Sequence, residues 1–346
     1  MATAVPNLLT FEEAIARAEP GKNKHVLLGN GFSRTCRNDI FAYDALFRRA
    51  DFTKLPFAQQ AFTALNTTDF ELVMLALRRS AILVTVYAPT NPDLAKLFRD
   101  EADALREVLA AAIAQNHPEY PAEIAPEQYA ACRRFLNHFN SVYTLNYDLL
   151  LYWAIMQSEV GQDLALGDDG FRTPDDRAAT YVTWDVEKTD RQDVHYLHGA
   201  LHLFDAGDEL KKYTWANTGI RLIDQIRDAL AKNFFPLIVS EGTSAEKMAR
   251  IQHSNYLGRS YRSFAKIGET LYIYGFAMGA NDEHWLRLIQ ANRKLKKLFV
   301  GLYDDPANPS NQRLIQRTLA IQEARSTSRF KLAVEFFDAA SATVWG

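Results

Sequence analysis

The sequence predicts an α/β fold, in which a mostly parallel sheet carries helices on both faces. Short apolar runs alternate with amphipathic segments of helical length along much of the chain. These runs are apolar nearly throughout, as expected for strands of a parallel sheet that is covered on both sides. Several of them end directly in glycine or polar residues, and parallel sheets bind ligands at the carboxyl ends of their strands.

The N-terminal elements follow from local signals. Residues 11–18 are predicted to form a short amphipathic helix with Thr10 as its N-cap, and Pro20-Gly21 ends it. Residues 25–28 then form a short buried strand. From 43 to 140 the apolar residues recur at helical spacing without a catalytic-looking cluster. This pattern predicts a helical insertion or cap inside a single domain that spans residues 1–346.

The second part of the chain predicts six further strands, with amphipathic helices between most of them. The strand-like runs are 141–144, 194–197, 236–240, 270–274, 297–300 and 331–337. Residues 161–190 are rich in Asp and Gly and are predicted to form a mobile surface loop.

Composition limits the possible functions. A formal net charge of −3 argues against a nucleic-acid partner that is bound by bulk charge. The only cysteines are Cys36 and Cys132, without a Cys-x-x-Cys pair, which excludes a zinc ribbon and suits a reducing compartment. Neither a signal-peptide pattern nor a long apolar run is present. We therefore expect a cytoplasmic protein without a membrane partner.

A glycine turn, Gly29-Asn30-Gly31-Phe32-Ser33, follows the first strand. Glycine allows close backbone approach, the exposed N–H groups of such a turn can hold a pyrophosphate, and Ser33 adds a hydroxyl donor. The third glycine of the usual dinucleotide fingerprint is absent. A tight strand-to-helix turn without a ligand explains the pattern equally well.

Two further motifs offer polar chemistry at strand ends. Asn146 and Asp148 follow the strand at 141–144 and suit ribose hydroxyls or a carboxamide, although Asp148 can also cap a helix that starts at Leu149. His198 precedes Gly199 and can act as a base or orient a hydroxyl, unless it is a structural histidine.

The nearby His195 does not extend the His198 motif into a metal site. A strand at 194–197 would place His195 on the opposite face from His198, so a joint metal site is not expected. A fourth segment, 274–285, runs from a strand through two glycines into Asp282, Glu283 and His284. An acid-rich helix N-terminus explains these residues better than a set of metal ligands does.

In their order and spacing these segments resemble the sirtuin superfamily, and more narrowly the zinc-less bacterial sirtuin-like NADase domains of antiphage defence proteins. Residues 29–33 are similar to the family's Gly-Ala-Gly-x-Ser, residues 144–148 to its Thr-x-Asn-x-Asp, and residues 197–199 to its catalytic His-Gly. Residues 239–242 and 274–278 hold the places of its later nucleotide-binding strand ends. The resemblance covers 25–33 and most of 141–303.

The sequence also departs from that family. The four zinc cysteines that follow His-Gly in sirtuin deacetylases are absent, as is the Gly-Ile-Pro-Asp-Phe-Arg stretch, and Asn30 replaces an alanine. These departures count against acyl-lysine deacylation and against a zinc site. Cleavage of the nicotinamide–ribose bond remains as the shared step.

The resemblance implies a Rossmann-like fold and an NAD⁺ glycohydrolase that releases nicotinamide and ADP-ribose, with a role as a bacterial immunity effector. It implies that Asn146 binds the nicotinamide ribose and orients water, that Asp148 contacts the carboxamide or supports the loop, and that His198 is the base. The residues implied to bind NAD are Gly29, Asn30, Gly31, Phe32, Ser33, Thr144, Gly199, Glu241, Gly275 and Phe276.

Several alternatives stay open from the sequence. The same pocket would serve a non-catalytic sensor of NAD or ADP-ribose, in which His198 is structural. It would also serve an ADP-ribosyltransferase, although no peptide-binding module is recognisable. NAD⁺ is the expected partner, and the sequence leaves open whether the protein forms a homo-oligomer.

Overall fold

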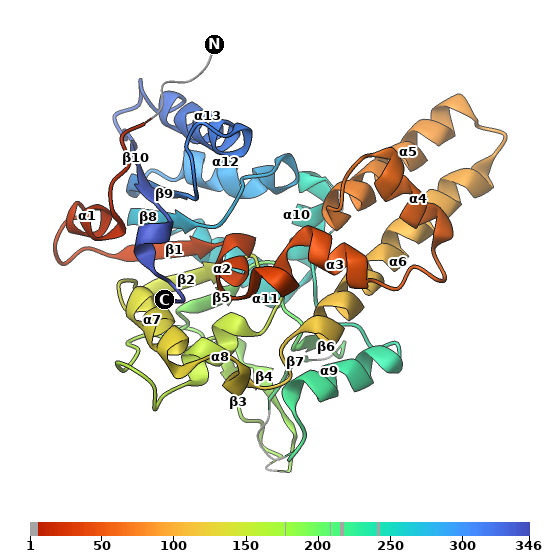
Figure 1. Cartoon of the computed structure of the whole chain (residues 1–346), viewed down its shortest axis with the longest axis horizontal. Helices are drawn as coiled ribbons and strands as arrows, with labels where there is room; N and C mark the ends of the chain where they lie inside the picture. Colours follow the sequence, from red (N-terminus) through yellow and green to blue (C-terminus); the bar gives the residue numbers. More distant parts are fainter. Residues whose placement is uncertain (1–5, 177, 208, 215–217, 241–242) are drawn as a thin grey trace.

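A six-stranded, all-parallel sheet forms the centre of the protein (Figure 1). The computed structural model describes residues 6–176, 178–207, 209–214, 218–240 and 243–346. The strands of this sheet are, in spatial order, β10 (Ala333–Asp338), β9 (Leu295–Leu302), β8 (Glu269–Tyr274), β1 (Lys24–Leu28), β2 (Ser141–Thr144) and β5 (Val194–Tyr196). The predicted α/β fold with a parallel sheet is confirmed.

The strand order reverses at the centre of the sheet. Numbered along the chain, the six strands lie in the order 6-5-4-1-2-3, which is the Rossmann arrangement. Leu28 at the end of β1 pairs with Tyr274 of β8 on one side and with Thr144 of β2 on the other. Ligands of such sheets bind at this switch point, outside the carboxyl ends of the strands.

Helices flank the sheet because its strands are buried. In β1, Val26, Leu27 and Leu28 are all fully buried, which requires apolar cover. The helices are α1 (Phe11–Ala16), α2 (Asn30–Phe41), α3 (Tyr43–Arg49), α4 (Pro56–Ala64), α5 (Phe70–Tyr87), α6 (Pro92–Asn116), α7 (Pro126–Leu136), α8 (Leu150–Met156), α9 (Leu222–Ala231), α10 (Ser244–His253), α11 (Asn255–Phe264), α12 (Glu283–Ala291) and α13 (Pro309–Glu323).

The predicted N-terminal helix is present and ends two residues early. Thr10 caps α1 through a capping box, in which its hydroxyl accepts from the Glu13 N–H and the Glu13 carboxylate accepts from the Thr10 N–H.

The stretch from α3 to α7 is helical, and α5 and α6 form a long hairpin that projects from the sheet (Figure 1). The hairpin starts at Asp69, whose carboxylate caps α5 by accepting from the N–H groups of Glu71 and Leu72. The first turn of α5 lies against the loop that follows β2, where the Tyr147 hydroxyl donates to Glu71. In the described part of the chain, no helix has the length and apolar character needed to cross a bilayer.

Two of the local predictions were wrong. The run 236–240 adds no strand to the sheet: Ile238 makes one isolated bridge with Gly199, and Leu237 bonds with Ala200 and Leu203 instead. The apolar run therefore packs along the loop that follows β5. Hydrophobic periodicity alone cannot distinguish a short buried loop segment of this kind from a strand.

The segment predicted as a mobile loop at 161–190 also contains strands. β3 (Phe171–Arg172) and β4 (Tyr181–Trp184) join β7 (Leu210–Tyr213) and β6 (Leu203–Asp205) in a second, antiparallel sheet of order β3-β4-β7-β6. The flanking Asp and Gly residues obscured the strand propensity of the aromatic and β-branched residues in β4. This strand also pairs with β7, which is distant in the sequence.

Candidate functional site

The glycine turn after β1 packs directly on the end of β8. The Gly29 N–H donates to the Tyr274 carbonyl and the Gly31 N–H to the Gly275 carbonyl, both at 2.9 Å. A Cβ on Gly31 would lie 2.4 Å from the Gly275 Cα, and one on Gly29 2.5 Å from the Gly275 carbonyl oxygen. Glycine is therefore required here for contact between two backbones, and two of the expected phosphate-binding amides already have protein acceptors.

We expect Gly31→Ala to lower the free energy of unfolding by about 1–3 kcal/mol, because the methyl group overlaps the Gly275 backbone. Urea unfolding of both variants measures the difference, with Gly268→Ala as the control, since a Cβ there meets nothing closer than 3.6 Å. Equal stability of the two variants would contradict the close packing of these two loops.

Ser33, Asn146 and Asp148 form a buried hydrogen-bonded chain. The Asn146 side-chain amide donates to the Ser33 hydroxyl at 2.9 Å, which donates to Asp148 Oδ2 at 2.5 Å. Asp148 Oδ1 accepts from the Leu150 N–H, so Asp148 also serves the start of α8, as the alternative interpretation expected. Burial raises the pKa of Asp148, although the bonds from Ser33 and Leu150 oppose this. These hydrogen bonds fix the Asn146 amide group, and among the described residues no donor contacts its side-chain oxygen, which can therefore accept from a ligand or water.

His117 supports the loop that carries Asp148. Its Nδ1 lies 3.0 Å from the Pro118 carbonyl oxygen, and its Nε2 lies 3.1 Å from the Leu149 backbone nitrogen, where it accepts the N–H. A neutral ring with the proton on Nδ1 satisfies both contacts. Burial lowers the pKa of His117 to about 4.

This pKa predicts acid sensitivity. Below about pH 6.5 the unfolded chain binds a proton at His117 that the folded protein takes up only near pH 4, so stability is lost as the pH falls through this window. We expect His117→Phe to reduce the slope of unfolding free energy against pH by up to about 1.4 kcal/mol per unit. Urea unfolding between pH 7 and 4.5 measures it, and an unchanged slope would contradict the assignment.

His198 lies at the end of β5, close to the end of β2. The Leu197 N–H donates to the Thr144 carbonyl at 2.8 Å, so the segments that carry Asn146 and His198 leave adjacent strands. Gly199 has a φ of +77°, and a Cβ there would lie 1.8 Å from the Leu237 carbonyl oxygen. This turn directs the His198 ring into the protein, where it is 2 % exposed.

The protonation state of His198 follows from its neighbours. Burial, and then the charge of Lys247, lower the pKa of His198 well below its usual value, so the ring is neutral near pH 7. The Trp285 indole N–H donates to Nε2 at 3.0 Å, which places the ring proton on Nδ1. His198 can therefore donate through Nδ1, whereas Trp285 must release Nε2 before that nitrogen acts as a base.

A buried lysine joins Asp282 to the helical hairpin. Lys247 of α10 lies 2.8 Å from Glu71 Oε2 and 3.0 Å from Asp282 Oδ1, and its side chain is 0 % exposed. Although burial opposes it, Glu71 and Asp282 raise the pKa of Lys247 and hold its charge. Tyr147, which directly follows Asn146, donates to Glu71 Oε1 at 2.9 Å and so links the two halves of the site.

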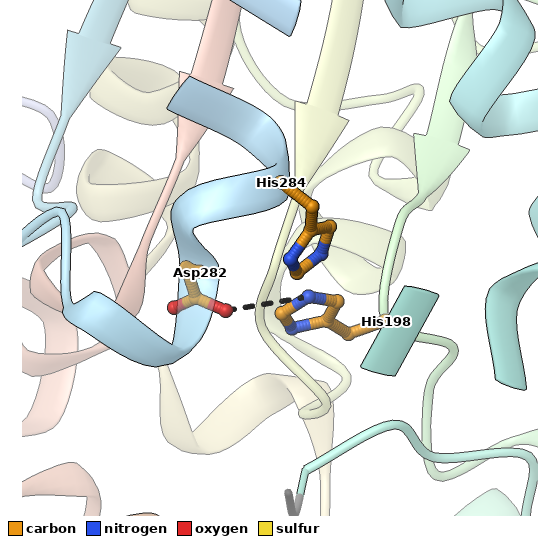
Figure 2. A group of neighbouring side chains, drawn as sticks. All are labelled: His198, Asp282 and His284. Atoms are coloured by element: carbon orange, nitrogen blue, oxygen red, sulfur yellow. Dashed lines mark ion pairs between the residues drawn. The ribbon is translucent and has the colours of Figure 1, made fainter. Parts of the chain in front are cut away.

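Asp282, His284 and His198 gather into one cluster (Figure 2). One ligating atom from each lies within 4.8 Å of the others. Glu283 is outside the cluster and pairs with Arg317 at 2.5 Å. Lys247 already occupies Asp282 Oδ1 and Trp285 occupies His198 Nε2, so this donor set favours a hydrogen-bonded cluster over a metal centre.

Comparison with known proteins places this chain in a family. Residues 26–345 match the family model described as a domain of unknown function, DUF4917. The chain belongs to the DUF4917 family. A comparison with curated proteins gave no match. The matched region begins in β1, so this DUF4917 domain includes every element that contributes to the site.

Other residues predicted to bind the nucleotide have structural partners in this DUF4917 domain. Phe32 is fully buried against Trp345, whose indole N–H donates to the Phe32 carbonyl. The Asn30 side chain donates to the Phe41 carbonyl, and the Thr144 hydroxyl accepts from the Asn146 N–H. Phe276 is buried where its backbone meets Gly29, and Glu241 lies outside the described residues.

The two histidines that flank His198 in the sequence, His195 and His202, serve the core. His195 stacks on Tyr143 and contacts the hydroxyls of Ser260 and Ser263, so it lies apart from the His198 cluster as predicted. His202 packs between the rings of Tyr152 and Tyr196.

Sequence reasoning missed Glu71 and Lys247 as members of the site. Each occurs in the first turns of an amphipathic helix, where a charged residue is ordinarily solvated. The only local signal is weak: Lys247 lies four residues before the buried Ile251 and therefore on the same face of α10.

Proposed function

We propose that this protein is an NAD⁺ glycohydrolase that acts in the cytoplasm. The observation that carries the proposal is the placement of Asn146 and His198 on segments that leave the adjacent strands β2 and β5, at the carboxyl edge of a sheet with Rossmann strand order. This edge is where such sheets bind dinucleotides. The sirtuin-like motifs described above supply the chemistry, and an immunity role is part of the same proposal.

In the proposed reaction water attacks C1′ of the nicotinamide ribose as the C1′–N bond breaks. The bonding electrons leave with nicotinamide, water supplies the hydroxyl of ADP-ribose, and the released proton goes to a base. The Asn146 carbonyl oxygen is suited to orient the water, because Ser33 fixes the amide. His198 is the base once Nε2 is released by Trp285, and the nearby carboxylates favour positive charge on the ribose.

Incubation of the purified protein with NAD⁺ tests the proposal by measurement of released nicotinamide. Because effectors of this kind are often silent until triggered, the assay covers each oligomeric form separated by gel filtration. Release of nicotinamide by the wild type supports the proposal. Its absence from every form would refute it.

A non-catalytic sensor of NAD or ADP-ribose is the second candidate, and one contact favours it. The Trp285 N–H occupies the only lone pair of the neutral His198 ring. Calorimetry with NAD⁺ and ADP-ribose distinguishes the two functions, because tight binding without nicotinamide release supports the sensor. Incorporation of labelled NAD⁺ into protein would instead indicate ADP-ribosyl transfer.

A further inference from the structure

His284 is a buried imidazole with an unused nitrogen. It is the second residue of α12 and is 5 % exposed. Its Nε2 has no hydrogen-bond partner among the described residues, whereas its Nδ1 lies 3.1 Å from the Ser244 hydroxyl. Leaving a buried polar atom without a partner is unfavourable, so such an atom is usually satisfied by a ligand or water.

The contacts of Ser244 favour a ring proton on Nε2 of His284. Its hydroxyl oxygen already accepts the His284 backbone N–H at 2.8 Å, and its own hydrogen is available to donate to Nδ1. Burial lowers the pKa of His284 to about 3, so the ring is neutral near pH 7, and donation from Ser244 to Nδ1 places its single proton on Nε2. His284 therefore presents an N–H donor.

This donor faces His198 and has no hydrogen-bond partner among the described residues. Figure 2 shows the two rings opposite each other, with centroids 6.1 Å apart, beside Asp282. The Nε2 lone pair of His198 is taken by Trp285, and Asp282 Oδ1 is taken by Lys247. An oxygen of a bound ligand at this place would give His284 the acceptor that it lacks.

We propose that His284 is a substrate-binding residue, positioned by Ser244, whose Nε2–H donates to an uncharged oxygen of the ligand beside His198. Glu71 and Asp282 lie close by and disfavour a phosphate oxygen at this place. On the proposed function, the oxygen belongs to the nicotinamide riboside half of NAD⁺, as a carboxamide or ribose oxygen. This inference rests on the proposed function for the identity of the ligand.

Nuclear magnetic resonance of protein labelled with ¹⁵N-histidine tests the proposal. We expect the His284 ring to carry its proton on Nε2 in the free protein, and NAD⁺ to shift that resonance. A proton on Nδ1, or NAD⁺ binding without a change at His284, would overturn it. Binding of added Zn²⁺ to His284 Nε2 without any NAD⁺ effect, abolished in His284→Phe, would identify a metal site. This result would also overturn the proposal.

Matched variants distinguish the hydrogen-bond donor of His284 from the packing of its ring. Calorimetry of NAD⁺ binding should show a loss of roughly ten- to one-hundred-fold for His284→Phe, a much smaller loss for His284→Gln, and none for His253→Phe, which alters an exposed histidine. ADP-ribose, which lacks nicotinamide, should be less affected if the carboxamide is the acceptor. Equal losses for Phe and Gln would refute a donor role.

The two proposals fail in different ways. If the wild type cleaves NAD⁺ and His284→Phe binds and cleaves it normally, the proposed function stands and this inference is refuted. If the wild type neither binds nor cleaves NAD⁺, the proposed function fails and the inference fails with it.

Discussion

Replacing Lys247 with methionine is expected to lower the free energy of unfolding by about 3–5 kcal/mol near pH 7, because the two carboxylates of Glu71 and Asp282 would lose the ammonium between them. The Lys247 side chain is wholly buried, so water does not compensate for the lost charge. Urea unfolding gives the difference, and Lys232→Met is the control, since it removes an exposed pair with Asp228 that contributes at most about 1 kcal/mol.

The loss of unfolding free energy in Lys247→Met should become smaller as the pH falls. Burial already raises the pKa of Glu71, with Lys247 opposing the shift, so loss of Lys247 raises this pKa further. A carboxyl group with a raised pKa stabilises the folded protein when protonated, and that stability is lost as the pH rises. The gap between Lys247→Met and the wild type should therefore narrow from pH 7 to pH 5. Addition of Glu71→Gln to Lys247→Met should recover part of the loss.

Two outcomes would contradict this account of the cluster. One is a Lys247→Met variant as stable as Lys232→Met, and the other is a gap that widens as the pH falls. Either result would mean that Lys247 does not hold a charge between Glu71 and Asp282.

The second large effect concerns turnover. On the proposed function, His198→Gln and Asn146→Ala should each reduce nicotinamide release by about 10²–10⁴-fold, because one removes the base and the other the group that orients water. Asn146 is fixed by Ser33, and His198 lies beside the same strand ends. The rate under saturating NAD⁺ measures the effect on kcat.

Controls must show that the variants fold and bind. Circular dichroism and calorimetry with ADP-ribose report these properties, and His253→Gln changes an exposed histidine that has no place in the proposed mechanism. Variants that bind ADP-ribose yet release nicotinamide as fast as the wild type would refute the catalytic assignment. Binding by all variants without turnover by the wild type would instead support the sensor.

Local patterns predicted well those elements that local physics determines. The Thr10 capping box and the buried run of β1 are encoded within a few residues, and both are present. The run at 236–240 has strand propensity, but its backbone bonds to the segment that follows β5 and not to β5 itself. For β4 a strand was instead missed, because its pairing partner β7 lies about thirty residues away in the sequence.

The residues of the candidate site likewise fall into those that local sequence identifies and those that it does not. Asn146, Asp148 and His198 could be selected from the sequence because each directly follows an apolar run, and strand ends collect at one edge of a parallel sheet. Glu71 and Lys247 could not, since their meeting depends on how the α5–α6 hairpin and α10 pack against η3 (Ala280–Asp282).

The sequence by itself determined a parallel α/β sheet and the strand ends that carry its polar residues, because strand burial and turn chemistry are local properties. Only the tertiary structure decided what those residues contact. It brought the Gly29 loop into contact with Gly275 and gave His198 Nε2 a donor in Trp285. It also placed Lys247 between Glu71 and Asp282. The reason is physical: side chains far apart in the sequence acquire their partners, charges and protonation states only when packing removes them from water.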